Sequence, residues 1–287
     1  MRLVSFGPRG SERAGILVDD GQTVVPVAGL DPALPDNVRL LIAGGHLPRL
    51  AALAVQQPRS VRLPVSTLRL GPPLTDPGKI ICIGLNYRGH ATEQNKPWPE
   101  QPLLFAKART ALAGANDDIV LPAADCGPDY EVELVAVIGR GGRRITEAKA
   151  LDHVAGWMVG NDVSARHWQK IDGQWFRAKS SDTFFPCGPA LVTADEVADH
   201  RALRLTTTIA GTVLQDSLAN DLIHGVATLI AYISRDLTLE PGDLISTGTP
   251  AGVGCYRTPP RFLTAGDVVE CAISGLGELR NRVVAAA

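Results

Sequence analysis

The sequence is poor in cysteine and has no paired cysteine motif. Its five cysteines are odd in number and far apart in a chain of 287 residues: Cys82, Cys126, Cys187, Cys255 and Cys271. Disulfide frameworks and structural zinc sites need cysteines in even numbers or in close pairs such as CxxC. The number and spacing of the cysteines exclude a disulfide framework and a structural zinc site. They fit a reducing compartment, so we expect a cytoplasmic protein.

Long apolar runs are missing as well. No stretch approaches the roughly 20 uninterrupted apolar residues of a membrane-spanning helix. The first residues, MRLVSFGPRGSERAGILV, have no apolar core followed by a small-residue cleavage site. We therefore expect neither a signal peptide nor a membrane partner.

The chain also lacks an excess of positive charge. Its formal net charge is −2 and its pI is near 6.3, so nucleic acid is not expected as a partner. Hydrophobic residues make up 45% of the chain. That fraction supports a large core, either in one long domain or in a small domain joined to a large one.

Turn residues divide the chain into many strand-like runs and few helical ones. A DDG hairpin turn, a helical piece over about 37–55 and a proline-rich, linker-like stretch over 61–79 mark the first part. The clearest helix covers about 221–235, with Asn220 as its N-cap. We predict a β-dominated α+β fold, with a small N-terminal α/β module over 1–70 and a catalytic domain over 71–287.

Two glutamates stand at the start of an apolar strand, PDYEVELVAVIG. Glu131 and Glu133 are two residues apart, so on a strand they point to the same face. An edge strand with a solvated face would explain the pair without any function. Burial would instead cost several kcal/mol for each unpaired charge, and a divalent cation between the two would offset that cost.

Asp162 offers a third carboxylate, in GWMVGNDVSAR, at the end of another strand. Taken alone, it would be an N-cap before VSARHWQ. Together with the two glutamates it makes an oxygen donor set suited to Mg²⁺ or Mn²⁺, and Ca²⁺ also fits. Zinc would prefer histidine or cysteine, and the sequence has no cluster of these.

His90 and Glu93 lie three residues apart in GLNYRGHATEQNKPWPEQP, and so share a face on a helical turn. A histidine oriented by a carboxylate is a usual general base, although a surface ion pair has the same spacing. The polar, proline-bearing residues up to 101 have the composition of a mobile lid.

Two further motifs are ambiguous on their own. Lys179, in FRAKSSDTFFPCGP, stands beside a hydrophobic, proline-rich turn, although a lone lysine usually lies on the surface. STGTPAGVG lacks the Lys-Ser/Thr ending of a phosphate loop. It is either a tight turn or a nest of backbone N–H groups that, with the Thr249 hydroxyl, holds a carboxylate.

In their order along the chain, these motifs resemble the fumarylacetoacetate hydrolase family. The resemblance runs from about Lys79 to the C-terminus, and residues 1–70 look like the family's common N-terminal appendage. It implies a mixed β-roll and, usually, a homodimer. The motifs that carry it are CIGLNYRGHATE, LLFAKA, DYEVELVAVIG, GNDVSAR, AKSSDTFFPCGPAL, LTLEPGDLISTGTPAGVG and GDVVECAISGLGELRN.

The resemblance also implies roles for single residues. Glu131, Glu133 and Asp162 would bind one Mg²⁺ or Mn²⁺. His90 and Glu93 would form a catalytic dyad, and Lys179 would be the active-site lysine. Arg166, Gln169 and Thr249 would contact the substrate.

Such a site stabilises the enolate of a 2-keto acid. We expect first a hydrolase that cleaves a C–C bond in a 2,4-diketo acid or acylpyruvate, giving pyruvate and a carboxylic acid, with water activated by His90. The same enolate arises in an oxaloacetate decarboxylase or a 2-hydroxymuconate-type keto–enol isomerase, which remain alternatives. An inactive metal-binding structural protein is a third, which the intact dyad and Lys179 disfavour.

Overall fold

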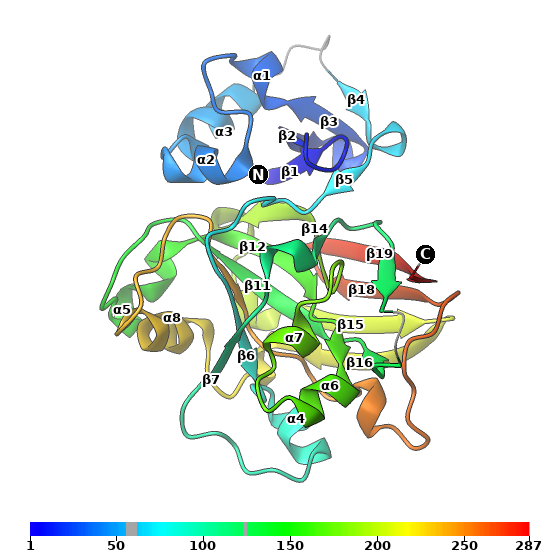
Figure 1. Ribbon diagram of the computed structural model, residues 1–287. Helices are drawn as coiled ribbons and strands as arrows, with labels where there is room; N and C mark the ends of the chain where they lie inside the picture. The colour runs from blue at the N-terminus through cyan, green and yellow to red at the C-terminus, as the bar shows by residue number, and fades with distance from the viewer. Residues whose placement is uncertain (56–61, 123–124, 287) are drawn as a thin grey trace.

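The computed structural model describes residues 1–55, 62–122 and 125–286. A small body built from the N-terminal residues sits on a larger body that holds most strands and helices (Figure 1). Strands form the framework of both bodies and the helices are short. The prediction of a β-dominated α+β fold is therefore confirmed. Within the described ranges, no helix has both the length and the apolar character needed to cross a bilayer.

The N-terminal residues build an antiparallel sheet with three helices beside it (Figure 1). The DDG segment forms the turn of the β2–β3 hairpin, as its sequence predicts. The helical piece expected over 37–55 is two helices, because Gly45 adopts a φ of +67° between them. The elements are β1 (Arg2–Phe6), β2 (Arg13–Val18), β3 (Thr23–Pro26), α1 (Val27–Leu30), α2 (Val38–Ala43) and α3 (Leu47–Val55).

The linker-like composition of 61–79 does not mark a free linker. Within it, β4 (Leu63–Pro64) pairs with β3, and β5 (Leu70–Gly71) pairs with β1. Residue 61 lies outside the described residues. Since β1 also pairs with β14 of the larger body, the two bodies share one sheet, and the boundary near residue 70 stays a prediction.

The long sheet has the order β4-β3-β2-β1-β14-β12-β11-β17-β6-β7. Every residue of β11 is buried. Leu134 and Ala136 pack into one core cluster, and Val135 and Val137 pack into another. Both faces of β11 are therefore covered, which explains its nearly continuous apolar sequence. In the larger body, the strands of this sheet are β6 (Ile80–Gly84), β7 (Leu103–Ala106), β11 (Val132–Ile138), β12 (Val154–Asn161), β14 (Phe185–Thr193) and β17 (Leu244–Ser246).

A second sheet, with the order β16-β15-β18-β19-β9, covers one face of the first. Buried residues alternate with more accessible ones along β15 and β18, as expected for strands with one solvated face. Its strands are β9 (Ile119–Leu121), β15 (Arg204–Ile209), β16 (Thr212–Leu218), β18 (Val268–Ile273) and β19 (Gly277–Ala285). Shorter strands are β8 (Leu112–Ala113), which joins β14, and the pair β10 (Pro128–Asp129) and β13 (Ser164–Ala165).

The helix expected over 221–235 begins later than predicted. It is α8 (Val226–Ser234), and its N-cap is Gly225, so the assignment of Asn220 as N-cap is wrong. Residues 219–221 form a separate turn, η7, because the Ile223 N–H donates to the Asn86 carbonyl instead of continuing a helix. The remaining helices are α4 (Arg88–Glu93), α5 (Glu147–Ala150), α6 (Arg166–Ile171) and α7 (Phe176–Lys179).

Asn86 joins three loops just before α4. Its buried amide donates to the carbonyls of Thr247 and His224, at 2.8 and 3.1 Å, and accepts from the His224 N–H at 2.9 Å. These bonds tie the end of β6 to the end of β17 and to the start of α8. Asn86 therefore fixes the place from which α4 begins.

We expect Asn86→Ala to lower the free energy of unfolding by about 2–4 kcal/mol, because it leaves buried backbone groups without partners. Urea unfolding of the purified variant measures this. Asn220→Ala, which alters an exposed side chain, is the control and should change stability little. A similar small change in both variants would contradict the role given to Asn86.

Candidate metal centre and active site

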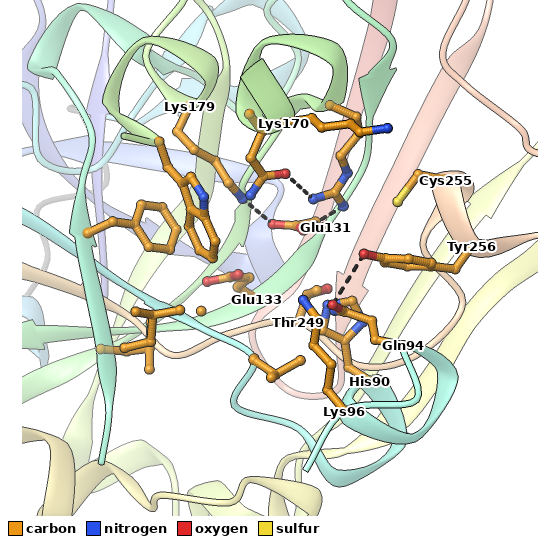
Figure 2. Close-up of a pocket in the computed structure, with 18 of the residues that line it drawn as sticks. His90, Gln94, Lys96, Glu131, Glu133, Lys170, Lys179, Thr249, Cys255 and Tyr256 are labelled. Atoms are coloured by element: carbon orange, nitrogen blue, oxygen red, sulfur yellow. Dashed lines mark hydrogen bonds and ion pairs between the residues drawn. The ribbon is translucent and has the colours of Figure 1, made fainter. Parts of the chain in front are cut away.

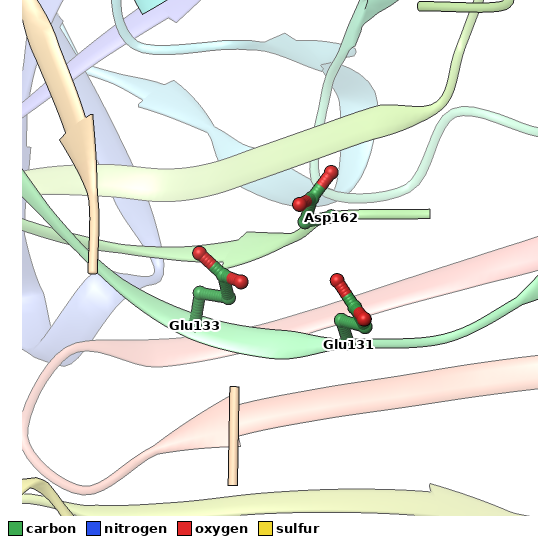
Figure 3. Close-up of side chains that lie close together, drawn as sticks. All are labelled: Glu131, Glu133 and Asp162. Carbon is green, nitrogen blue, oxygen red and sulfur yellow. The ribbon is translucent and has the colours of Figure 1, made fainter. Parts of the chain in front are cut away.

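Three buried carboxylates converge where the β11–β12 hairpin opens. Glu131 immediately precedes β11, Glu133 lies within it, and Asp162 follows β12. The pairing of Val132 with Asn161 brings these ends together, and Figure 3 shows the three side chains facing one another. Each offers an oxygen, and these oxygens lie within 4.8 Å of one another. We call this group the carboxylate triad.

Two buried lysines contact the carboxylate triad. Lys179 Nζ donates to Glu131 Oε2 at 2.5 Å and to Asp162 Oδ2 at 2.7 Å. Lys107, which follows β7, donates to Asp162 Oδ1 at 2.6 Å. Sequence reasoning missed Lys107, although a lysine directly after the apolar strand LLFA is a signal that could have found it. Asp162 is therefore an ion-pair partner rather than the N-cap of α6, which is Ala165.

Electrostatic surroundings differ within the triad. Burial alone would raise the pKa of Glu131, but Arg166 and Lys179 outweigh burial and hold that pKa well below the usual range. Burial raises the pKa of Glu133 well above its usual range, and the charges of Asp162 and Glu131 add to this effect. Glu133 accepts hydrogen bonds from the Ser246 hydroxyl and the Gly248 N–H, which are neutral donors.

This arrangement fits a divalent cation. The donors are carboxylate oxygens, the ligands that Mg²⁺ and Mn²⁺ prefer. They lie close enough to share one ion, and Glu133 has no cationic side chain bonded to it among the described residues. Added positive charge at this place would stabilise the ionised form of Glu133.

Arg166 sits at the start of α6 and links the triad to a second buried acid. Its guanidinium donates to Asp129 at 2.9 Å, to Glu131 at 2.6 Å and to Gln169 Oε1 at 3.0 Å. Asp129, fully buried, also accepts the N–H groups of Gly254 and Cys255. Sequence reasoning missed Asp129, although it continues the alternation of acids toward the N-terminus from Glu131 and Glu133.

The two residues of the predicted dyad meet on α4. His90 Nδ1 lies 2.5 Å from Glu93 Oε1, and Glu93 Oε2 accepts the Gly252 N–H at 2.8 Å. The other ring nitrogen, Nε2, lies 2.6 Å from the Gln94 side-chain amide. His90 is buried, so both edges of its ring are held by protein groups.

Thr249 is buried in the loop after β17. Its hydroxyl donates to the Val132 carbonyl at 2.9 Å and accepts from Gln215 Nε2 at 2.8 Å. Gln215 also accepts the Val132 N–H. These bonds attach the glycine-rich loop to the strand that carries the two glutamates.

A cavity of about 620 Å³ unites these groups (Figure 2). Glu93 and Asp162 are not on its wall but contact residues that are. Lys96 and Lys170 add positive charge to the wall, and Phe105, Trp175 and Tyr256 add aromatic surface. The predicted site residues that line it are His90, Glu131, Glu133, Arg166, Gln169, Lys179 and Thr249.

Comparisons with known proteins identify the family to which the chain belongs. Residues 79–284 match the family model described as fumarylacetoacetate (FAA) hydrolase C-terminal. The chain is 42% identical to the mitochondrial oxaloacetate tautomerase fahd2 of Xenopus laevis over 288 residues, which cover 99% of this chain and 90% of the relative.

Two solved structures share the complete fold. A crystal structure of a putative HpcE protein from Mycobacterium smegmatis superposes with a TM-score of 0.89 at 39% identity, with all of both chains covered. Maleylpyruvate hydrolase from Sphingobium sp. SYK-6, crystallised with manganese(II) and pyruvate, has a TM-score of 0.83 at 31% identity, again over all of both chains. The predicted family fold is therefore confirmed.

We expect Mn²⁺ or Mg²⁺ to raise the thermal unfolding midpoint of the metal-stripped protein. An ion at 100 times its dissociation constant contributes about 2.7 kcal/mol to stability. Glu133→Gln should remove most of this shift, because it removes a charged ligand. Differential scanning calorimetry with and without the ion measures it.

Glu278→Gln, at an exposed acid, is the matched control and should keep the full shift. If Glu133→Gln responded to the ion as strongly as the control does, the carboxylate triad would not be the binding site.

Proposed function

Because the chain belongs to the fumarylacetoacetate hydrolase family, whose members include hydrolases, isomerases and tautomerases, we propose that it catalyses the keto–enol tautomerisation of oxaloacetate. The observation that carries the proposal is the full-length identity to an oxaloacetate tautomerase, joined to a cavity that holds every predicted substrate-facing residue. Tautomerisation of oxaloacetate is itself a keto–enol isomerisation, the reaction type of one of the two alternatives to the C–C hydrolase that the sequence first suggests, and the relatives support this alternative better than the hydrolase.

Tautomerisation needs a group that moves a proton between C3 of the substrate and the protein. His90 supplies it. The Nδ1 edge of its ring faces the Glu93 carboxylate, and a carboxylate accepts a hydrogen bond, so the N–H lies there and the lone pair lies on Nε2. From the keto form, the C3–H bond breaks, Nε2 takes the proton, and the electron pair forms the C2–C3 double bond.

Negative charge then develops on the C2 oxygen. Lys179 places a buried ammonium group on the cavity wall beside Glu131, where it stabilises that charge. Return of the proton from Nε2 to the same oxygen completes the enol and leaves His90 neutral again, and the reverse steps give the keto form. A Mg²⁺ or Mn²⁺ held by the carboxylate triad would add Lewis-acid stabilisation of an oxyanion.

Positive charge on the cavity wall suits a substrate with two carboxylates. Arg166 and Lys179 lie at its inner end, where they contact the triad. Lys96 and Lys170 are exposed, and neither is bonded to an acid among the described residues. This positive charge strengthens the binding of a dianion such as oxaloacetate and raises its rate of association with the cavity.

A second candidate is hydrolysis of an acylpyruvate. It is favoured by the structural likeness to maleylpyruvate hydrolase with manganese(II) and pyruvate. The predicted homodimer and the cytoplasmic location stay predictions. The Xenopus relative is named as mitochondrial.

The proposal predicts that the protein, supplied with Mg²⁺ or Mn²⁺, accelerates conversion of enol oxaloacetate to the keto form. The change in ultraviolet absorbance of the enol follows this conversion. His90→Ala should lose roughly 10²–10⁴-fold in rate, the usual contribution of general acid–base catalysis. His46→Ala, in the turn between α2 and α3, is the control and should retain the wild-type rate.

Carbon dioxide and pyruvate are measured in the same samples. Tautomerisation releases neither, whereas decarboxylation of oxaloacetate releases both. Pyruvate release from an acylpyruvate, without acceleration of enol conversion, would replace the tautomerase proposal with the hydrolase.

A further inference from the structure

We propose that Gln94 is a positioning residue for His90: its amide caps Nε2 in the substrate-free protein, fixes the reactive tautomer, and is displaced when Nε2 takes a proton. The assignment of a reaction to His90 rests on the proposed function. The contact between the two side chains does not.

The donor in this contact is unambiguous once the amide is oriented. Gln94 Nε2 lies 2.6 Å from His90 Nε2, and an amide nitrogen donates but does not accept. His90 Nε2 must therefore carry the lone pair. This agrees with the opposite edge of the ring, where Nδ1 faces the Glu93 carboxylate at 2.5 Å. Glu93 and Gln94 thus select the same tautomer from opposite edges.

Tyr256 contacts the other end of the Gln94 amide. Its hydroxyl donates to Gln94 Oε1 at 3.2 Å, the dashed bond between these residues in Figure 2. Because Nδ1 of His90 donates to Glu93 and Nε2 is bare, the NH₂ group faces His90 and the oxygen faces Tyr256. Tyr256 ends the short turn η8 (Gly254–Tyr256), and its ring also meets the His90 ring edge-on, with centroids 6.1 Å apart.

The cap lies on the wall of the cavity and its outer part is open to solvent. Gln94, His90 and Tyr256 all line the cavity, and Tyr256 is 45% exposed. Gln94 is the residue directly after α4, so its side chain can leave His90 without unfolding a helical turn. His90 itself stays anchored through Glu93, which is bound to the Gly252 N–H.

Capping has a direct consequence for reactivity. A nitrogen lone pair that accepts a hydrogen from Gln94 does not at the same time accept one from a substrate. The amide must leave before His90 acts as a base. Until then, Nε2 is shielded from other electrophiles that enter the cavity.

The first test measures this shielding in the resting protein, without substrate. Diethyl pyrocarbonate modifies histidine at the unprotonated ring nitrogen, and peptide mass spectrometry resolves His90 from the other histidines. Gln94→Ala should be modified at His90 about three- to tenfold faster than wild type, the effect of losing one hydrogen bond. Tyr256→Phe should fall between the two.

The matched control is another glutamine–tyrosine pair in the same segment. Gln101 Oε1 accepts from the Tyr232 hydroxyl at 3.1 Å, without a bond to His90. Gln101→Ala should leave the His90 modification rate unchanged. Equal rates in wild type and Gln94→Ala would overturn the proposal, and so would equal acceleration in Gln101→Ala.

The second test uses Gln94→Glu, which replaces the donor with a carboxylate of similar shape. An ionised carboxylate accepts, so His90 should bind a second proton on Nε2. Nitrogen-15 NMR of histidine-labelled protein should then show both ring nitrogens protonated at neutral pH. In wild type it should show Nδ1 protonated and Nε2 bare. A bare Nε2 in Gln94→Glu would contradict donation by Gln94.

Activity adds a separate readout. At neutral pH, kcat of Gln94→Glu should be about tenfold below that of Gln94→Ala, because only the glutamate draws a proton to the base. If the wild-type protein is active and the two variants have equal kcat values, the proposal is overturned. Both variants keep the other titratable groups of the cavity. These are Glu93 on α4, Lys96 after it, Glu131 and Glu133 at β11, Arg166, His167 and Lys170 on α6, Lys179 on α7, and Cys255 and Tyr256 on η8.

The tests also separate the two proposals. Modification and NMR need no turnover. If they behave as expected while enol oxaloacetate is not converted, the proposed function fails and the role of Gln94 as a cap stands.

Discussion

The energetic constraint on this structure is the burial of three carboxylates at one end of a hairpin. Three like charges in a low-dielectric interior are costly unless cations compensate them. The chain provides Lys107 after β7, Arg166 at the start of α6 and Lys179 at the end of α7. These elements are distant in sequence and must meet at the β11–β12 hairpin before the charges are balanced. Burial raises the pKa of Glu133, so the cations of the protein do not fully compensate the negative charge of this carboxylate. A divalent ion bound at the triad would complete the compensation.

A single segment that begins at the last residue of β17 joins this charged centre to His90, the proposed base. Along residues 246–256, Ser246 and Gly248 bind Glu133, the Gly252 N–H binds Glu93, and the Tyr256 hydroxyl binds Gln94. Gly252 has a φ of +103°, and a side-chain carbon there would lie 2.1 Å from the Leu214 carbonyl oxygen. Only glycine fits at this position, since both the conformation and the space exclude a Cβ atom. Through these hydrogen bonds, the segment holds α4 in a fixed position relative to the carboxylate triad.

Much of the fold and the site could be predicted from the sequence, partly from local spacing rules and partly from the resemblance to a known family. The two-residue spacing of Glu131 and Glu133 gives a shared face on a strand, and the three-residue spacing of His90 and Glu93 gives a shared face on a helical turn. Long-range contacts were not predictable in this way. Asn220 has the chemistry of an N-cap, but bonds from Asn86 to a distant loop delay α8 to Val226. Lys107 and Asp129 were missed because their partners, Asp162 and Arg166, lie far along the chain.

The same residues suit tautomerisation and C–C hydrolysis, and the substrate decides between the two. His90 is the base in both proposals, and the cavity of about 620 Å³ has room for a four-carbon acid together with water, each molecule of which fills about 30 Å³ in the liquid. In an acylpyruvate, C4 is a ketone that water can attack. In oxaloacetate, C4 belongs to a carboxylate, whose negative charge repels a nucleophile. Attack of water at C4, the step that C–C hydrolysis needs, is therefore disfavoured, and proton transfer at C3 is the step that the proposed base can perform.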